Sequence, residues 1–186
     1  MTGTRRSWLR WDVTGVGRLA PLGHTMRAMP SDSGVTTIRC DQCGKTNRVP
    51  VAADGKPRCG NCKAPLPWLV DAGDDSFADV VDRAHVPVLV DLWAPWCGPC
   101  RMVSPALEQI AHELAGRIKL VKVNVDMAPA IARRFEAQSI PMLIMMSGGQ
   151  VLARRVGAAP ADQLRTWVTE LLPDQRPEAG TTSPSR

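Results

Sequence analysis

The sequence predicts an α/β protein with a small cysteine-rich module in front of it. Two observations support this fold class. Between residues 68 and 172, short apolar runs typical of strands alternate with segments of helical periodicity. Between residues 36 and 66, four of the chain's six cysteines stand in two pairs, and the segment is rich in turn residues. The 186 residues are therefore enough for one ordinary domain and something smaller.

The elements of the larger domain follow one another with short connections. Apolar runs predict strands at 68–71, 86–93, 118–125, 142–146 and 151–156. Helical periodicity and proline positions predict helices at 75–83, 97–115, 129–135 and 160–172. The run at 86–93 is continuously apolar, which suits a central strand. The segment Ser147–Gln150 predicts a tight hairpin turn, because paired glycines tolerate positive φ.

Composition divides the chain into four parts. Residues 1–35 form a basic arm with five arginines against one aspartate within residues 1–30, and we expect this arm to be disordered. Residues 36–66 form the cysteine module, residues 67–172 the α/β domain, and residues 173–186 a polar tail that we also expect to be disordered. Translation could equally begin at Met26 or Met29, and the sequence leaves that open.

Cysteine usage and charge limit the classes of function. All six cysteines occur in three CxxC pairs, which is typical of reduced cytoplasmic proteins rather than of secreted disulfide frameworks. We therefore expect a cytoplasmic protein. No apolar run approaches the ~20 residues of a membrane helix, so we expect no membrane association. The net charge of +5 lies mostly in the arm, and we expect no nucleic-acid partner.

The spacing of the first two cysteine pairs predicts a structural zinc site. Fifteen residues separate the pairs, which fits a zinc ribbon with the ligands Cys40, Cys43, Cys59 and Cys62. So small a module cannot build its own core, and the metal would hold its fold. Gly44 and Gly60 fall where each pair should turn tightly. Nearby basic residues would offset the charge of four thiolates, namely Arg39, Lys45, Arg48, Lys56, Arg58 and Lys63. The alternative is two further redox pairs, which would need an oxidising compartment.

The third pair has the features of a redox centre. Cys97 and Cys100 follow a predicted strand and open a predicted helix, and their spacing lets the sulfurs close a disulfide. Unpaired N–H groups and the helix dipole at that position favour a thiolate. We expect Cys97 to be the exposed nucleophile and Cys100 the buried thiol that resolves the mixed disulfide. The alternative is a purely structural disulfide.

Residues 68–172 resemble the thioredoxin family. The likeness rests on the segment Val90–Cys100, which ends in Trp-Cys-Gly-Pro-Cys, and on Ser139-Ile140-Pro141, which resembles the segment carrying the family's cis-proline. The cysteine module in front of this domain resembles the zinc ribbon of the second, zinc-binding type of bacterial thioredoxin. The resemblance implies a thioredoxin fold, which has a central mixed sheet flanked by helices.

The resemblance also implies an activity and its partners. The expected activity is protein-disulfide reduction by dithiol–disulfide exchange, and the Gly-Pro between the cysteines implies a reductant. Electrons would come from NADPH through thioredoxin reductase, and the substrates would be disulfide-containing proteins. The thiols carry the electrons, so no organic cofactor is expected. We expect a monomer.

The same resemblance implies roles for individual residues. Asp91 matches a buried acid that takes the proton from the resolving cysteine, and Lys122 matches a lysine that approaches this acid. A docking surface for substrate is implied at Trp96, Gly98, Pro99, Ile140, Pro141 and Gly157. Met142 departs from the threonine common in the family. Trp93 fits the core and the docking surface equally well.

Two other functions remain open from the sequence. The zinc ribbon could be the working part of a redox-regulated chaperone or adaptor, in which oxidation releases the metal. The redox centre could also belong to a disulfide isomerase or an oxidant. The three histidines, His24, His85 and His112, are scattered, and we expect them at solvated positions.

Overall fold

The structure is a computed structural model that describes residues 34–52 and 55–173. Met26 and Met29, the alternative starts, lie outside these residues. The two ends that we expect to be disordered also lie outside them, apart from positions 34, 35 and 173. The strands are β1 (Val35–Arg39), β2 (Thr46–Pro50), β3 (Leu69–Asp71), β4 (Val88–Trp93), β5 (Lys119–Asn124), β6 (Met142–Ser147) and β7 (Gln150–Val156). The helices are η1 (Ala78–Asp82), α1 (Gly98–Glu113), α2 (Pro129–Arg134) and α3 (Ala161–Glu170).

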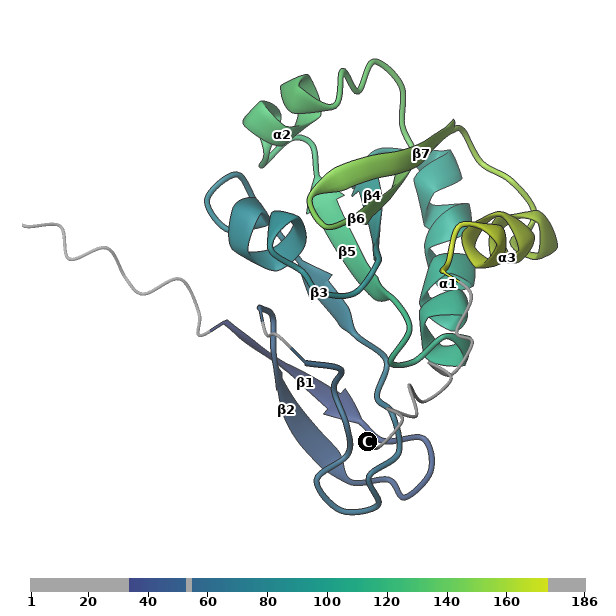
Figure 1. Ribbon diagram of the computed structural model, residues 1–186. Helices are drawn as coiled ribbons and strands as arrows, with labels where there is room; N and C mark the ends of the chain where they lie inside the picture. Colours follow the sequence, from purple (N-terminus) through teal and green to yellow (C-terminus); the bar gives the residue numbers. More distant parts are fainter. Residues whose placement is uncertain (1–33, 53–54, 174–186) are drawn as a thin grey trace, which may run out of the picture. The chain divides into compact units, whose positions relative to one another are not determined.

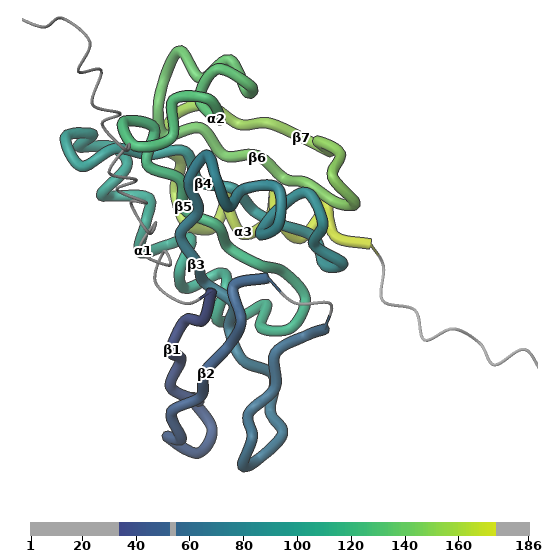
Figure 2. The backbone as a smooth tube through the Cα atoms, turned by 90° about the vertical axis from the view of Figure 1, so that its left-hand side faces the viewer, coloured from purple at the N-terminus to yellow at the C-terminus, as the bar shows by residue number. Residues whose placement is uncertain are grey.

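Five strands form one mixed sheet in the order β3-β5-β4-β6-β7 (Figure 1). The pairs β3–β5 and β5–β4 are parallel, whereas β4–β6 and β6–β7 are antiparallel. Figure 2 shows β6 and β7 running side by side after their hairpin turn. Gly148 and Gly149 have φ of 55° and 75° in that turn, as expected. The apolar strand β4 lies at the centre of the sheet, because only a strand covered on both faces can bury such a run.

Helices cover both faces of this sheet, which confirms the predicted fold class. On one face, α1 and α3 pack through Leu107 and Leu164 against strand residues such as Leu89. On the other face, η1 and α2 pack against a second core that includes Val90 and Phe77. In Figure 1, α1 and α3 lie together on one side of the strands, and η1 and α2 lie on the other. None of the helices among the described residues has the length and hydropathy needed to cross a membrane.

The first helix differs from the expectation of an ordinary helix at 75–83. It is a single π-helical turn, in which the N–H of Arg83 bonds to the carbonyl of Ala78. Val80 and Val81 still face the core, as their spacing indicated. A segment this short owes its form to tertiary packing rather than to propensity.

The cysteine module is an antiparallel hairpin followed by a second cysteine turn. Strands β1 and β2 pair from Val35 to Pro50, and the first CxxC pair lies in the connection between them. A short antiparallel bridge between Arg58 and Pro65 brackets the second pair. The two turns therefore present their cysteines from separate backbone segments.

Two buried donors join this hairpin to the α/β domain. The indole N–H of Trp68 donates to the carbonyl of Pro50 at 3.0 Å. The ammonium of Lys119 donates to the carbonyls of Val51 and Val80, and it lies 4.2 Å from the centre of the Trp68 ring. Lys119 is 1% exposed, and burial lowers its pKa to about 8. Both donors bond to backbone carbonyls at the end of β2.

Candidate functional site

Cys97 and Cys100 form a disulfide at the start of α1, with an S–S distance of 2.04 Å. Cys97 is the N-cap of this helix, and its sulfur accepts a hydrogen bond from the N–H of Cys100 at 3.1 Å. After reduction, the same N–H and the positive end of the helix dipole would face a thiolate on Cys97. The local structure therefore favours negative charge on the first sulfur.

The two sulfurs differ in exposure less than expected. Cys97 is 4% exposed and Cys100 is 1% exposed, so Cys97 is the more accessible of the two but is not an open thiol in this oxidised form. Its sulfur lies 3.8 Å from the carbonyl oxygen of Ile140, which belongs to a distant loop. The family resemblance implied Ile140 and Pro141 for the docking surface around the redox pair, although not this contact of the Ile140 carbonyl with the Cys97 sulfur.

An open groove borders the disulfide. It has a volume of about 380 Å³ and is lined by Trp96, Val125, Ala137, Gln138, Ser139 and Ile140. The Trp96 side chain is 69% exposed, and its N–H donates to Asp126 at 2.9 Å. An exposed aromatic ring tethered at one end provides apolar contact area beside the reactive sulfur.

The Ile140–Pro141 peptide bond is cis, as the family resemblance implies. The carbonyl of Pro141 accepts a hydrogen bond from the N–H of Gly157 at 2.8 Å. Gly157 has a φ of 88°, a conformation that favours glycine. The hydrogen bond from Gly157 therefore joins the end of β7 to Pro141.

Asp91 is a buried acid on β4, the strand that precedes the redox pair in the chain. It lies in the middle of β4, is 1% exposed, and has no hydrogen-bond partner among the described residues for either carboxylate oxygen. Burial raises its pKa to about 6, while the charge of Lys122 lowers it and that of Glu108 raises it. This pKa suits a group that exchanges protons near neutral pH.

Lys122 lies on the strand next to Asp91 but forms its ion pair elsewhere. The two residues are partners in the parallel register of β4 and β5. The ammonium of Lys122 lies 3.0 Å from Glu108 on α1 and 5.3 Å from the centre of the Trp93 ring. Trp93 is partly buried, and its indole N–H has no partner among the described residues.

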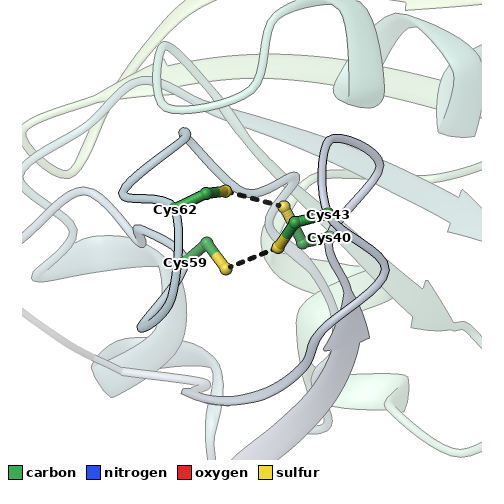
Figure 3. Close-up of side chains that lie close together, drawn as sticks. All are labelled: Cys40, Cys43, Cys59 and Cys62. Atoms are coloured by element: carbon green, nitrogen blue, oxygen red, sulfur yellow. Dashed lines mark hydrogen bonds between the residues drawn. The ribbon is translucent and has the colours of Figure 1, made fainter.

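The four ribbon cysteines converge, as Figure 3 shows. Their sulfurs all lie within 4.8 Å of one another, with Cys40 and Cys62, and likewise Cys43 and Cys59, 3.6 Å apart. A tetrahedral zinc site with Zn–S bonds of ~2.3 Å has sulfurs about 3.8 Å apart, so this cluster fits the metal. A hydrogen bond from the backbone of Cys62 is the main cause that lowers the pKa of Cys59 to about 6. The pKa of Cys62 is raised instead, so the convergence of the four sulfurs, rather than the pKa of one thiol, is what fits a zinc site.

The two cysteine turns share one hydrogen-bond pattern. In the first, the N–H of Gly44 bonds to the carbonyl of Cys40; in the second, the N–H of Lys63 bonds to the carbonyl of Cys59. Gly44 has a φ of 70° and Lys63 has a φ of 62°. Gly60 lies within the second turn, and the left-handed residue of each turn is the one after the second cysteine of the pair.

Asn47 connects the two turns. Its amide donates to the carbonyl of Lys45 at 2.8 Å and to the sulfur of Cys59 at 3.6 Å. Its oxygen accepts from the N–H of Gly60 at 2.9 Å. One side chain thus links both cysteine segments and contacts a candidate ligand directly.

Comparisons with known proteins agree with this geometry. The sequence model of the thioredoxin family matches residues 68–170. The chain is 45% identical over 102 residues to a thioredoxin of Haemophilus influenzae, which covers 55% of this chain and 95% of the relative. It is 50% identical over 91 residues to thioredoxin 1 of a Nostoc species, covering 49% of this chain and 85% of the relative. It is 34% identical over 131 residues to the chloroplastic thioredoxin M4 of Arabidopsis thaliana, covering 69% of this chain and 68% of the relative.

The redox pair at the start of α1 and these relatives together define a thiol–disulfide oxidoreductase. Within that class, the chain belongs to the thioredoxin family.

Sequence reasoning missed three residues that the structure brings to these sites. Glu108 pairs with Lys122, Asp126 holds Trp96, and Asn47 joins the cysteine turns. Nothing in the sequence distinguishes Glu108 from Glu113, the other acidic residue of α1, as the partner of Lys122. His112, expected to be merely solvated, bonds to Asp41 at 2.9 Å.

Proposed function

We propose that this chain is a protein-disulfide reductase of thioredoxin type that works by dithiol–disulfide exchange. The observation that carries the proposal is the Cys97–Cys100 pair at the N-terminus of α1, preceded in the chain by a central strand that buries the carboxyl group of Asp91. The family membership supports the same activity. It favours this function over a chaperone or adaptor based on the ribbon, which would not need this redox centre.

The first step is attack by the Cys97 thiolate on a substrate disulfide. A new S–S bond forms between Cys97 and one substrate sulfur, and the other substrate sulfur leaves as a thiolate that takes a proton from solvent. The N–H of Cys100 lies 3.1 Å from the attacking sulfur and favours its ionised form.

The second step is attack by Cys100 on the sulfur of Cys97. Cys100 must first lose its proton, and Asp91 is the proposed acceptor, with a pKa near 6. The S–S bond to substrate breaks, the Cys97–Cys100 disulfide forms, and the second substrate thiolate leaves. Two electrons and two protons have then passed to the substrate. Lys122 acts in this step through its charge, which favours the ionised form of Asp91.

Thioredoxin reductase, with NADPH as the electron source, is the proposed partner that restores the dithiol. The substrates are disulfide-containing proteins that dock over the groove beside Trp96 and Ile140. The other proposed docking positions are Gly98, Pro99, Pro141 and Gly157. A side chain at Gly98 would meet no atom within 4 Å, which suits a position on a contact surface. The cysteine usage supports a reducing compartment, the cytoplasm.

The proposed metal is one structural zinc ion held by Cys40, Cys43, Cys59 and Cys62. The convergence of the four sulfurs supports this assignment. Bound there, zinc would stabilise the fold of the small hairpin and take no part in electron transfer. Metal analysis should find one zinc per chain in the wild type and none in Cys59→Ser.

The activity is tested by reduction of insulin disulfides with NADPH and thioredoxin reductase. We expect turnover in the wild type, none in Cys97→Ser, and a trapped mixed disulfide with insulin in Cys100→Ser. Folded wild-type protein that shows no turnover would contradict the proposal.

Measurement of the redox potential against glutathione separates a reductant from an isomerase or an oxidant. We expect a potential in the range of reducing thioredoxins, about −270 mV, rather than near −120 mV. A potential at the oxidising end would favour the alternative function.

A further inference from the structure

Three charged side chains from three elements meet on the α1 face of the sheet. Successive strand residues point to opposite faces, and Leu89 and Leu120 belong to the core under α1. Asp91 and Lys122 stand two positions further along the same strands and so share that face. Glu108 reaches them from α1, with its carboxylate 3.0 Å from the Lys122 ammonium.

The ammonium of Lys122 forms its ion pair with Glu108 rather than with Asp91. Its other contact is the Trp93 ring, whose centre is 5.3 Å away. Both oxygens of Asp91 lack a hydrogen-bond partner among the described residues. The positive charge therefore acts on Asp91 from a position that Glu108 fixes, and the negative charge of Glu108 partly cancels it.

We propose that Glu108 is a positioning residue that holds and partly neutralises Lys122, and thereby sets how readily Asp91 accepts the proton of Cys100. This inference rests on the proposed function, in which Asp91 is the base. Glu108 would act without touching the substrate or the sulfurs.

The sign of the effect follows from the charges that face Asp91. Lys122 on β5 favours its ionised form and Glu108 on α1 opposes it, while β6 presents the apolar Leu143 at the paired position. Neutralising Glu108 removes its own repulsion of the Asp91 carboxylate and also releases the Lys122 ammonium, which is then free to approach the unpartnered oxygens of Asp91. The ionised form of Asp91 is then favoured, and its pKa falls. Because the Glu108 side chain is 45% exposed, solvent screens its charge, and we expect a shift of about half a pH unit.

The test is a carbon-13 NMR titration of the Asp91 carboxyl group in the oxidised full-length protein. We expect Glu108→Gln to lower the titration midpoint by about half a pH unit. The matched control is Glu113→Gln, which removes the same charge from the same helix but from a pair with Arg165 at 2.6 Å. An unchanged midpoint in Glu108→Gln, or an equal shift in Glu113→Gln, would overturn the proposal.

A second background tests whether Glu108 acts through Lys122. In Lys122→Met, adding Glu108→Gln should shift the Asp91 midpoint by less than half of the shift seen with Lys122 present. An equal shift in both backgrounds would mean a direct effect and would overturn the positioning role. The acidic limb of the pH profile of insulin reduction should shift to lower pH together with the Asp91 midpoint. Absence of insulin reduction alongside a normal Asp91 shift would count against the proposed function and not against the link between Glu108 and Asp91.

Discussion

At the level of single residues, Asp91 occupies an environment far from that of an ordinary carboxylate. The carboxyl group lies on a central strand with no hydrogen-bond partner among the described residues. Its raised pKa means that the folded protein prefers the neutral acid. The burial that raises this pKa therefore destabilises the fold whenever Asp91 is ionised.

We expect Asp91→Asn to increase stability above pH 6 and to slow insulin reduction. The pKa is raised from 3.8 to about 6, so wild-type stability falls as the pH rises through that window. The asparagine variant does not ionise, and its gain at pH 8 should be roughly 3 kcal/mol, shrinking towards zero below pH 4. Urea unfolding at several pH values measures this, with the exposed Asp79→Asn as the control. A gain in the free energy of unfolding that stays constant from pH 4 to pH 8 would indicate an effect of packing rather than of ionisation.

At the level of elements, the strands and longer helices could be predicted because their apolar residues follow a clear period. The predicted strand at 118–125 became β5 at Lys119–Asn124, and the long helix became α1. The π-helical form of η1 could not be predicted, since it depends on how its five residues pack against the core. The ion pair between Glu108 and Lys122 also escaped prediction, because it joins segments distant in sequence. The family resemblance, in contrast, already implied Ile140 for the docking surface beside Cys97.

The two cysteine turns adopt the same left-handed backbone conformation at different conformational free energies. Equivalent positions hold Gly44 and Lys63, both with positive φ. Glycine adopts this conformation freely, whereas a side chain there costs about 1 kcal/mol. The second turn is therefore the more strained of the two.

We expect Lys63→Gly to stabilise the zinc-loaded protein by roughly 0.5–1 kcal/mol, because it relieves the left-handed backbone. The variant loses a hydrogen bond from the lysine to the carbonyl of Gly60, but that bond is exposed and contributes little. Urea unfolding measures the change. Gly44→Ala is the reciprocal variant and should lower stability. A destabilised Lys63→Gly would show that the lysine contact outweighs the backbone strain.

At the level of the whole molecule, the ribbon and one face of the sheet share a hydrophobic core. Ile38 and Val49 of the hairpin belong to the same buried cluster as Trp68 and Val90. Leu66, in the connection between the two modules, is fully buried. Loss of the ribbon fold would therefore remove contacts from the sheet as well.

We expect removal of zinc to lower the stability of the whole described structure rather than of the hairpin alone. A ligand that binds only the folded state stabilises every part that unfolds with it. Far-ultraviolet circular dichroism and tryptophan fluorescence should show coincident urea transitions that move together to lower urea after chelation. Cys59→Ser should already show the lower midpoint and should not respond to chelator. A sheet transition that is unchanged by chelation would show that the modules unfold independently.

The contacts of Trp68 and Lys119 with the end of β2 carry a further consequence for the ancestry and engineering of the ribbon. Both donors bond to main-chain carbonyls of Pro50 and Val51, and these groups are present whatever side chains the hairpin carries. These two contacts thus depend on the path of the hairpin backbone, whereas Ile38 and Val49 contribute side chains to the shared core. A redesigned hairpin without cysteines should dock in the same place if it keeps those apolar side chains and offers two carbonyls at the end of β2. Conversely, a chain cut back to residue 68 would leave the Trp68 indole without its acceptor and the Lys119 ammonium with the carbonyl of Val80 alone.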